Sequence, residues 1–309
     1  MILHPNIIGI DVCKAHFDIF DSERGRPERL PNSAEAAHAL ADRLAARQDG
    51  FAIFEATGDY DRHLRGAFDA RAIAYARVNP QQARDFARAM GRRAKSDALD
   101  ARMLARMAQA LELAPTPARD ALRDRVAALH KRRDQLIEHR AAEKARLKEG
   151  HDPDGSITRH LTWLNTEIAH FDRLIAEAIE NSPALTEQAD LMRSVPGVGP
   201  VAATTLIALM PELGTLSPGT AAALAGLAPY DNDSGLWRGV RRIGGGRRRV
   251  RRALYMAALA AARSQSSFKR FYQALRARNK PAKVALTALA RKLIIVLNAI
   301  LRDKIAFQE

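Results

Sequence analysis

The sequence has little of the chemistry that builds disulfide scaffolds, zinc clusters or membrane spans. Its 309 residues include one cysteine, Cys13, which excludes an intrachain disulfide and a cysteine zinc cluster and fits a reducing compartment. The longest apolar run near the end, LIIVLNAIL, falls short of the roughly 18 residues that a membrane span requires. The opening segment MILHPNIIGIDVCK lacks the basic and long apolar regions of a signal peptide. We therefore expect a soluble cytoplasmic protein with no membrane partner.

Acidic residues are also scarce relative to basic ones. Lysine and arginine number 49 against 35 aspartates and glutamates, which gives a formal charge of +14 and a sequence pI near 10.4. This excess indicates a polyanionic partner, with nucleic acid first; the alternative is an arginine-rich composition without functional meaning. With 47% hydrophobic and 27% charged residues, the chain can bury real cores and is long enough for two domains with a spacer.

Residues 1–112 alternate between apolar runs that favour strands and amphipathic runs that favour helices. The predicted strands lie in NIIGIDVCKAHFDIF, RPERLPNS, GFAIFEATG and IAYARVNP. The predicted helices lie in SAEAAHALADRLAAR, opened by Ser33, in YDRHLRGAFDARA and PQQARDFARAMG, and from Ser96 onward. This order predicts an α/β sheet with helices on its faces.

The remaining residues are predicted to be helical in two parts. Residues 113–190 carry an apolar seam at spacings of three and four on both sides of the turn GHDPDGS, which predicts an antiparallel coiled-coil spacer. Residues 191–309 read as a mainly α-helical domain that contains one dense arginine segment.

Four acids stand out in the first 112 residues. Asp11 interrupts the apolar run IIGIDVCK, and Glu55 ends the run FAIFEATG; a carboxylate in a buried strand is costly unless it is paired or binds a cation. Asp97 and Asp100 are three residues apart where a helix begins, which places them about 4.5 Å apart along the helix axis and about 60° around it. The alternatives are strand-end carboxylates satisfied by backbone N–H groups and an ordinary capped helix start.

Gathering these acids would be unfavourable without a cation, because two carboxylates about 4 Å apart repel by about 4 kcal/mol at an effective dielectric of 20. A two-metal site for phosphoryl transfer uses such a shared carboxylate set. Oxygen-only ligands favour Mg²⁺ or Mn²⁺. We therefore expect Asp11, Glu55, Asp97 and Asp100 to form a metal site.

The segment SVPGVGPVAATTLIAL has the form of a helix-hairpin-helix. Gly197 and Gly199 would leave backbone N–H groups free at the start of the helix after Pro200, where they could bind a nucleic-acid phosphate. An ordinary tight turn between two packed helices is the alternative.

Basic charge is concentrated in the segment RGVRRIGGGRRRVRR, residues 238–252. Guanidinium groups suit phosphates, and Gly244–Gly246 would let the backbone approach a strand closely; a solvated basic helix is the alternative. The arginines predicted to bind nucleic acid are Arg238, Arg241, Arg242, Arg247, Arg248, Arg249, Arg251 and Arg252.

Ser234 lies in NDSGLW, a polar stretch just before the arginine segment. By residue type alone, a turn serine or a helix cap is the better interpretation.

The three acidic segments GIDVCKAHFD, FEATGDY and KSDALDARMLA resemble the motifs of the DEDD transposases of bacterial insertion sequences, and the last third resembles the second conserved domain of that family. The resemblance implies an RNase H-like (RuvC-like) first domain with Asp11, Glu55, Asp97 and Asp100 as the metal-binding tetrad. It also implies that Ser234, in GLAP…SG, is the nucleophile that forms a 5′-phosphoserine link to DNA. Cys13, where these proteins often carry serine, and IGGGRRR, which differs from a Ser-Lys-x-Gly variant of some members, depart from the family pattern.

The family resemblance further implies Mg²⁺ dependence, a structured guide RNA encoded by the element, donor and target DNA as partners, homodimers that assemble into tetramers, and a location at the bacterial nucleoid. The residues alone support a basic, metal-dependent polynucleotidyl transferase. Two other functions stay open: a junction-resolvase-like nuclease that uses metal-activated water, and a non-catalytic nucleic-acid-binding protein whose acids are structural.

Overall fold

The computed structural model describes residues 6–47, 50–56, 58–91, 97–116, 120–150, 152–231, 239 and 241–309, without the side chains of 97–99. The chain forms two compact units, residues 1–119 and 120–309. Each unit has cores of its own.

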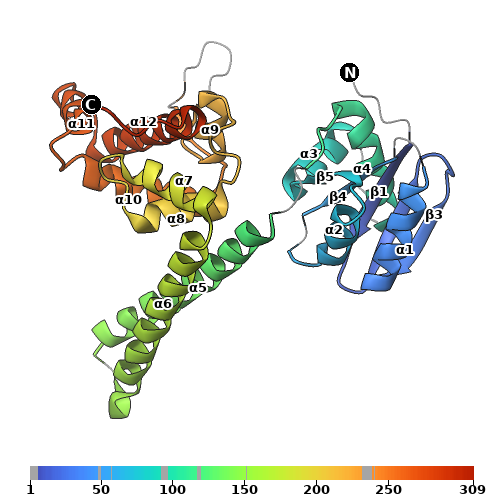
Figure 1. Cartoon of the computed structure of the whole chain (residues 1–309), viewed down its shortest axis with the longest axis horizontal. Coiled ribbons are helices and arrows are strands. Elements are labelled where there is room, and N and C mark those ends of the chain that lie inside the picture. Colours follow the sequence, from blue (N-terminus) through green and yellow to red (C-terminus); the bar gives the residue numbers. More distant parts are fainter. Residues whose placement is uncertain are drawn as a thin grey trace. The chain divides into compact units, whose positions relative to one another are not determined.

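The first unit is built on a mixed five-stranded sheet (Figure 1). Its strands are β1 (Asn6–Val12), β2 (His16–Asp21), β3 (Pro27–Pro31), β4 (Gly50–Glu55) and β5 (Ala74–Val78), in the order β3-β2-β1-β4-β5. The first three strands form an antiparallel meander, and β4 and β5 continue the sheet parallel to β1. The prediction of an α/β sheet for residues 1–112 is confirmed.

Helices cover both faces of this sheet. They are α1 (Ala34–Ala45), α2 (Arg62–Asp69), α3 (Pro80–Ala89) and α4 (Asp97–Leu111). One face buries Ile8, Ile10 and Phe54 with residues of α1 and α2, and the other buries Ile7, Phe51 and Ile53 with residues of α3 and α4. Because side chains alternate along a strand, the near-continuous apolar runs of β1 and β4 supply both cores.

The predicted helix starts have clear local causes. The Ser33 hydroxyl accepts a hydrogen bond of 3.2 Å from the N–H of Ala36 and caps α1. At α3, Asn79 accepts from the N–H of Gln81 at 2.8 Å, and Pro80 follows at the first helical position. A side-chain cap satisfies one of the N–H groups that a helix start leaves without a partner.

Gly9, in the middle of β1, allows α4 to lie directly against the sheet. A Cβ atom at this position would be 2.0 Å from the carbonyl oxygen of Ala101 and 2.8 Å from the backbone nitrogen of Ala105. Both distances are far inside van der Waals contact, so only glycine permits this approach. The contact fixes the height of α4 along β1.

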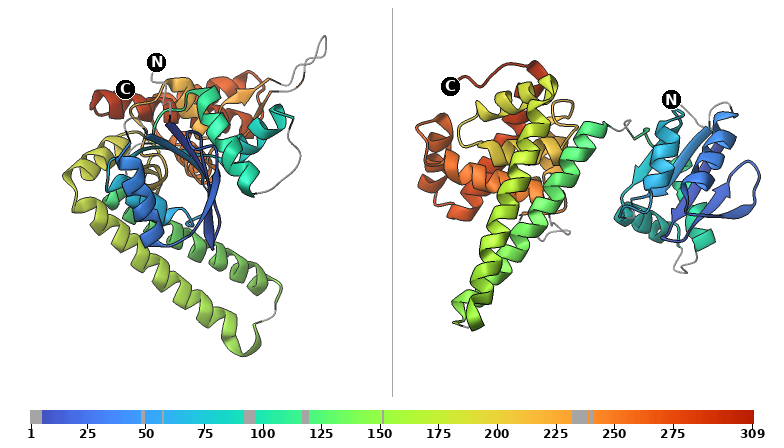
Figure 2. Two further views of the ribbon diagram at one scale, coloured as in Figure 1. Left: turned by 90° about the vertical axis from the view of Figure 1, so that its right-hand side faces the viewer. Right: turned by 60° about the horizontal axis from the view of Figure 1, so that its bottom comes forward.

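The second unit opens with two long helices, α5 (Ala121–Lys148) and α6 (Ser156–Glu180), which lie side by side in both views of Figure 2. Leu136 on α5 packs with Leu164 and Ile168 on α6 in a small core of their own. Nearer their other ends, Val126 and Ile175 join the core of the remaining helices. The helical pair predicted within residues 113–190 is therefore present, while the three-domain division at 1–112, 113–190 and 191–309 stays a prediction.

The rest of the second unit is mainly helical, with one short antiparallel strand pair. The elements are α7 (Pro183–Arg193), α8 (Pro200–Leu209), α9 (Pro218–Leu224), β6 (Pro229–Tyr230), β7 (Arg242–Ile243), α10 (Arg248–Ala261), α11 (Ser267–Ala277) and α12 (Ala282–Asp303). Alanine-rich faces let these helices pack closely, as at Ala258 of α10 and Ala290 of α12, which are fully buried.

Helix α12 is long and apolar enough, by length and composition, to cross a membrane, and half of its most apolar window is buried inside the protein. Leu289, Leu293 and Leu297 are fully buried in the core of the second unit. A core helix accounts for this composition as well as a membrane span does.

The Gly9 contact makes a prediction about stability. Gly9→Ala should lower the free energy of unfolding by about 2 kcal/mol, because the new methyl group would have to displace the backbone of α4. Gly66→Ala is the control: Gly66 lies inside α2 with no atom within 4 Å of a Cβ at that position, so alanine there should stabilise by about 0.5–1 kcal/mol. Urea unfolding of both variants measures the difference, and equal stabilities would contradict the role given to Gly9.

Candidate functional site

The first two predicted acids lie at the same edge of the sheet. β1 and β4 are parallel neighbours with Ile10 opposite Phe54, so Asp11 and Glu55 come next at adjacent positions. Both side chains are half-buried. The carboxyl ends of parallel strands form one edge, which is where open α/β sheets bind their ligands.

Both acids point to the face that α4 covers. Alternation along β1 places Asp11 on the same face as Ile7 and Gly9, and alternation along β4 places Glu55 with Phe51 and Ile53. Ile7, Phe51 and Ile53 are packed with Leu104, Ala105 and Ala108 of α4.

Helix α4 runs antiparallel to β1 and begins at this edge. Ala101 meets Gly9, and the following turns of α4 pack toward Ile7. Asp100, half-buried, directly precedes Ala101. The backbone thus brings Asp11, Glu55 and Asp100 to one edge and one face of the sheet, while the side chain of Asp97 lies outside the described part of the chain.

The donor set at this edge is carboxylate oxygen, which fits a hard divalent cation such as Mg²⁺ or Mn²⁺. Among the side chains that the structure describes, no group of three or more histidines, cysteines, aspartates or glutamates is gathered closely enough to hold a metal ion. What comes together at this edge is therefore the backbone: the ends of β1 and β4 and the start of α4.

A further acid, Asp18, lies directly opposite Asp11 in the β1–β2 ladder. It is only 6% exposed, and Arg29 donates to both of its oxygens, from Nε at 2.8 Å and from an Nη at 3.0 Å. Nε2 of His16 lies 3.0 Å from the same carboxylate. Sequence reasoning missed Asp18, although the alternation in HFDIFD places it on the face of Asp11; the paired guanidinium makes a buried charge acceptable there.

The loop that follows Glu55 is anchored by another acid that the sequence did not single out. Asp61 is completely buried, and it accepts hydrogen bonds from Nε of Arg65 at 3.0 Å and Nε of Arg77 at 2.5 Å. Arg77 also donates to the carbonyl of Gly58 at 3.4 Å. In the segment FEATGDYD, Glu55 thus faces the α4 side, whereas Asp61 has a structural role.

The candidate nucleophile lies between two paired strands. β6 and β7 are antiparallel, with Pro229 opposite Ile243 and Tyr230 opposite Arg242. Ser234 and Arg238 belong to the segment between these strands and lie outside the described residues.

The described arginines of residues 238–252 fall into two groups. Four make contacts within the protein: Arg241 with Asp231, Arg247 with the carbonyl of Leu209 and with Glu212, Arg249 with Asp134, and Arg251 with the carbonyls of Gly226 and Gly245. Arg242, Arg248 and Arg252 are exposed and form no ion pair with a residue that the structure describes. The exposed three are therefore the ones available to phosphates.

Two glycines predicted to approach nucleic acid instead pack against the protein. At Gly246 (φ 64°) a Cβ would lie 2.2 Å from the nitrogen of Gly226, and at Gly197 (φ 88°) it would lie 2.5 Å from the carbonyl oxygen of Ala257. Gly197 therefore seats the turn between α7 and α8 on α10. At Gly199 a Cβ would meet nothing within 4 Å, so this glycine lies on the open side of the turn.

Two family models of transposases match the chain. One, for the DEDD transposases of IS110 elements, matches residues 8–150, and the other, described as the transposase IS116/IS110/IS902 family, matches residues 189–273. The first match spans the sheet edge with its acids, and the second spans the α7–α8 turn and the arginine segment.

Curated relatives point to the same family. The chain is 28% identical to the pilin gene-inverting protein of Moraxella bovis over 267 residues, which cover 83% of this chain and 81% of that protein. It is 33% identical over 153 residues, or 49% of this chain and 37% of the relative, to an uncharacterised protein of insertion element IS116 from Streptomyces clavuligerus. An uncharacterised protein of IS110 from Streptomyces coelicolor is 38% identical over 132 residues, which are 42% of this chain and 31% of that protein. Since both halves match models of one family, the chain belongs to the DEDD transposases of the IS110 and IS116 insertion sequences, enzymes that recombine DNA.

Proposed function

We propose that this protein is a Mg²⁺-dependent site-specific recombinase that cuts and rejoins DNA through Ser234, with its sites chosen by a structured RNA encoded in the element. The observation that carries the proposal is the placement of Asp11 and Glu55 at the ends of neighbouring parallel strands, with the start of α4, which bears Asp100, packed on the same face of the sheet. The name of the Moraxella relatives supports a reaction that exchanges strands between two sites.

Asp11, Glu55, Asp97 and Asp100 would hold Mg²⁺ or Mn²⁺. When bound, the cations supply positive charge beside a scissile phosphodiester, where negative charge develops during phosphoryl transfer. The chain's own contribution is placement: β1 and β4 present two acids side by side, and the Gly9 contact sets the start of α4 beside them.

Ser234 would act as the nucleophile. Its Oγ forms a bond to the phosphorus and loses its proton, while the bond from phosphorus to the 3′ oxygen of the neighbouring nucleotide breaks and that oxygen takes up a proton. The product is a 5′-phosphoserine link and a free 3′ hydroxyl. Attack by another strand's 3′ hydroxyl on this link restores the phosphodiester and the serine, so rejoining needs no external energy source.

Exposed arginines would bind the phosphates of DNA and of the guide RNA. Arg242, Arg248 and Arg252 lie within residues 241–252 and face solvent. The family resemblance implies the RNA partner and the assembly of dimers into a tetramer. The α5–α6 pair offers a surface on which protomers could join.

The metal proposal is tested by calorimetry with Mg²⁺ and Mn²⁺. The protein should bind both ions, and Asp11→Asn and Glu55→Gln should each weaken binding at least about tenfold, because each removes a charged ligand. Glu35→Gln, an exposed acid of α1, changes the net charge equally and should bind as the native protein does. If the native protein binds neither ion, the metal proposal is wrong and the acids have a structural role.

The nucleophile is tested by trapping a covalent protein–DNA product on denaturing gels, with DNA that carries the ends of the element and RNA transcribed from its flank. Ser234→Ala should abolish the product, since no other group would take its place. Ser267→Ala, in the first turn of α11, should form the product at the native level. Continued strand cleavage by Ser234→Ala, without the adduct, would identify a nuclease that uses water instead.

The basic segment is tested by the salt dependence of DNA binding. Replacing both Arg242 and Arg248 by glutamine should reduce the slope of log affinity against log salt by about 2, because each phosphate contact contributes about 0.9. Arg302→Gln, which removes one positive charge, is the control. Arg302 pairs with Asp303 on α12, and its replacement should leave the slope unchanged. An unaltered slope in the double variant would show that these arginines do not contact phosphates.

A further inference from the structure

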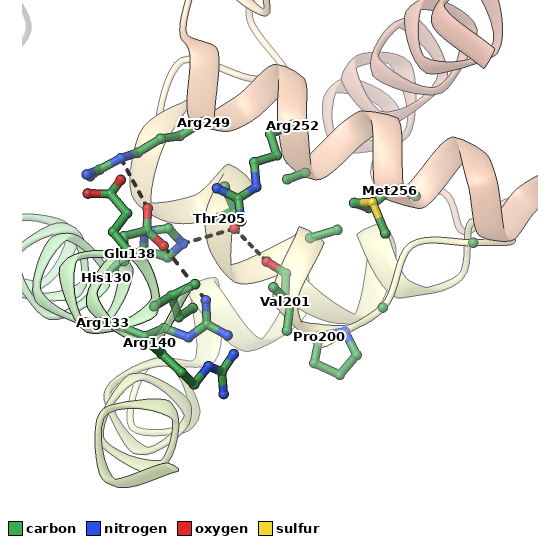
Figure 3. A pocket seen from close by; sticks show the side chains of 17 residues that line it. His130, Arg133, Glu138, Arg140, Pro200, Val201, Thr205, Arg249, Arg252 and Met256 are labelled. Carbon is green, nitrogen blue, oxygen red and sulfur yellow. Dashed lines mark hydrogen bonds and ion pairs between the residues drawn. The ribbon is translucent and has the colours of Figure 1, made fainter. Parts of the chain in front are cut away.

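A pocket of about 450 Å³ lies where α5, the start of α8 and α10 meet, all within the second unit (Figure 3). α5 contributes His130, Arg133 and Arg140, α8 contributes Val201, and α10 contributes Arg252 and Met256. A volume of this size is typical of sites that hold a small molecule or one residue of a polymer.

The pocket is basic. Four arginines, Arg133, Arg140, Arg249 and Arg252, line it together with the carboxylates of Asp134 and Glu138. Nε of Arg249 lies 3.2 Å from Asp134, and Arg140 donates to Asn165 at 3.1 Å. Arg252 is exposed and forms no ion pair within the described part of the chain, so its charge is available to an anion.

The first turn of α8 faces the same space. Gly199 is the N-cap of α8, and no side chain caps the helix. Uncapped N–H groups at a helix start carry partial positive charge and bind phosphate oxygens. The phosphate end of a ligand would therefore lie between this turn and Arg252.

Exposed apolar side chains form another part of the wall. Val201 is 53% exposed and Met256 is 57% exposed, and both line the pocket. Apolar groups that remain in water beside a phosphate site offer a surface on which a planar base can lie.

His130 links α5 to α8 behind the wall of the pocket. It is 2% exposed, and its Nε2 is 2.9 Å from Oγ of Thr205, whose proton goes to the carbonyl of Val201 at 2.6 Å. The Thr205 oxygen must then accept from Nε2–H, which leaves Nδ1 as an acceptor. Nδ1 is buried without a hydrogen-bond partner among the described residues, and Oδ2 of Asp134, at 3.7 Å, is too far away to donate or accept.

Burial lowers the pKa of His130 below its usual value, with the Asp134 charge acting in the opposite direction. The imidazole is therefore neutral at neutral pH and keeps its Nδ1 lone pair. Nδ1 has almost no accessible surface, so it is not open to a ligand, and His130 acts as a structural link between α5 and α8.

We propose that this pocket receives one unpaired nucleotide of a nucleic-acid strand. Its phosphate binds at the start of α8 and at Arg252, and its base lies against Val201 and Met256. A base held in a duplex cannot leave its partner to enter a pocket without cost, so the site selects bulged or extruded positions. This inference rests on the part of the proposed function that has the chain bind nucleic acid.

The test compares labelled hairpin duplexes that are fully paired, carry one unpaired nucleotide, or carry an abasic residue at that position, each made as DNA and as RNA. The native protein should bind the unpaired probe about tenfold more tightly than the paired and abasic probes, as expected for one stacked base. A preference in the RNA set alone would show that the pocket also contacts the sugar hydroxyl, and a preference in both sets would show that it recognises the base.

Variants of exposed residues avoid a loss of folding. Met256→Ala and Arg252→Gln should each remove most of the preference for the unpaired probe. Arg248→Gln, on the same helix and outside the pocket lining, should weaken all probes equally and keep the preference. Val284→Ala, at an exposed apolar position of α12, should leave all probes unchanged.

Equal affinity for paired and unpaired probes, or a preference that survives Met256→Ala, would overturn the pocket assignment. A preference equal for the abasic and unpaired probes would also overturn it, because duplex distortion alone would then explain the binding. Binding to nucleic acid with no preference would leave the proposed recombinase standing, whereas no binding to any probe would contradict both. A preference that persists while Ser234→Ala fails to abolish the adduct would leave the pocket standing alone.

Discussion

The backbone contact between Gly9 and Ala101 is the constraint on which the candidate catalytic edge depends. Because no side chain separates β1 from α4 at this point, the helix cannot slide along the strand without losing a close-packed surface. Asp11 is two residues beyond Gly9, and Asp100 is one residue before Ala101. Acids far apart in the sequence are therefore held at one edge by a contact that involves none of them.

The second unit uses the same device. Gly197 seats the α7–α8 turn on α10, and Gly246 seats the start of α10 on Gly226. These contacts fix the first turn of α8 beside the exposed face of α10 that carries Arg252 and Met256. In both units, glycines that bring backbones together position the groups that we propose for metal and nucleic-acid binding.

Much of the fold could be predicted from the sequence because local signals agree with the tertiary structure. The apolar runs that contain Asp11 and Glu55 and the cap at Ser33 all predicted the correct elements. The acids could be singled out because a carboxylate at the end of a buried strand is unusual. The pairing of Asp18 with Arg29, the burial of Asp61 and the orphaned nitrogen of His130 could not be predicted, since each depends on partners distant in the sequence. Likewise, a run of arginines does not reveal which side chains bond to Leu209, Glu212 and Asp134 and which face solvent.

The central claim is that Asp11, Glu55 and the start of α4 bind a divalent cation together. Anomalous diffraction from crystals grown with Mn²⁺ tests it most directly. The account predicts a manganese peak within bonding distance of the carboxylates of Asp11 and Glu55, with a ligand from Asp97 or Asp100. Manganese bound only elsewhere, with these carboxylates engaged by protein groups alone, would contradict it.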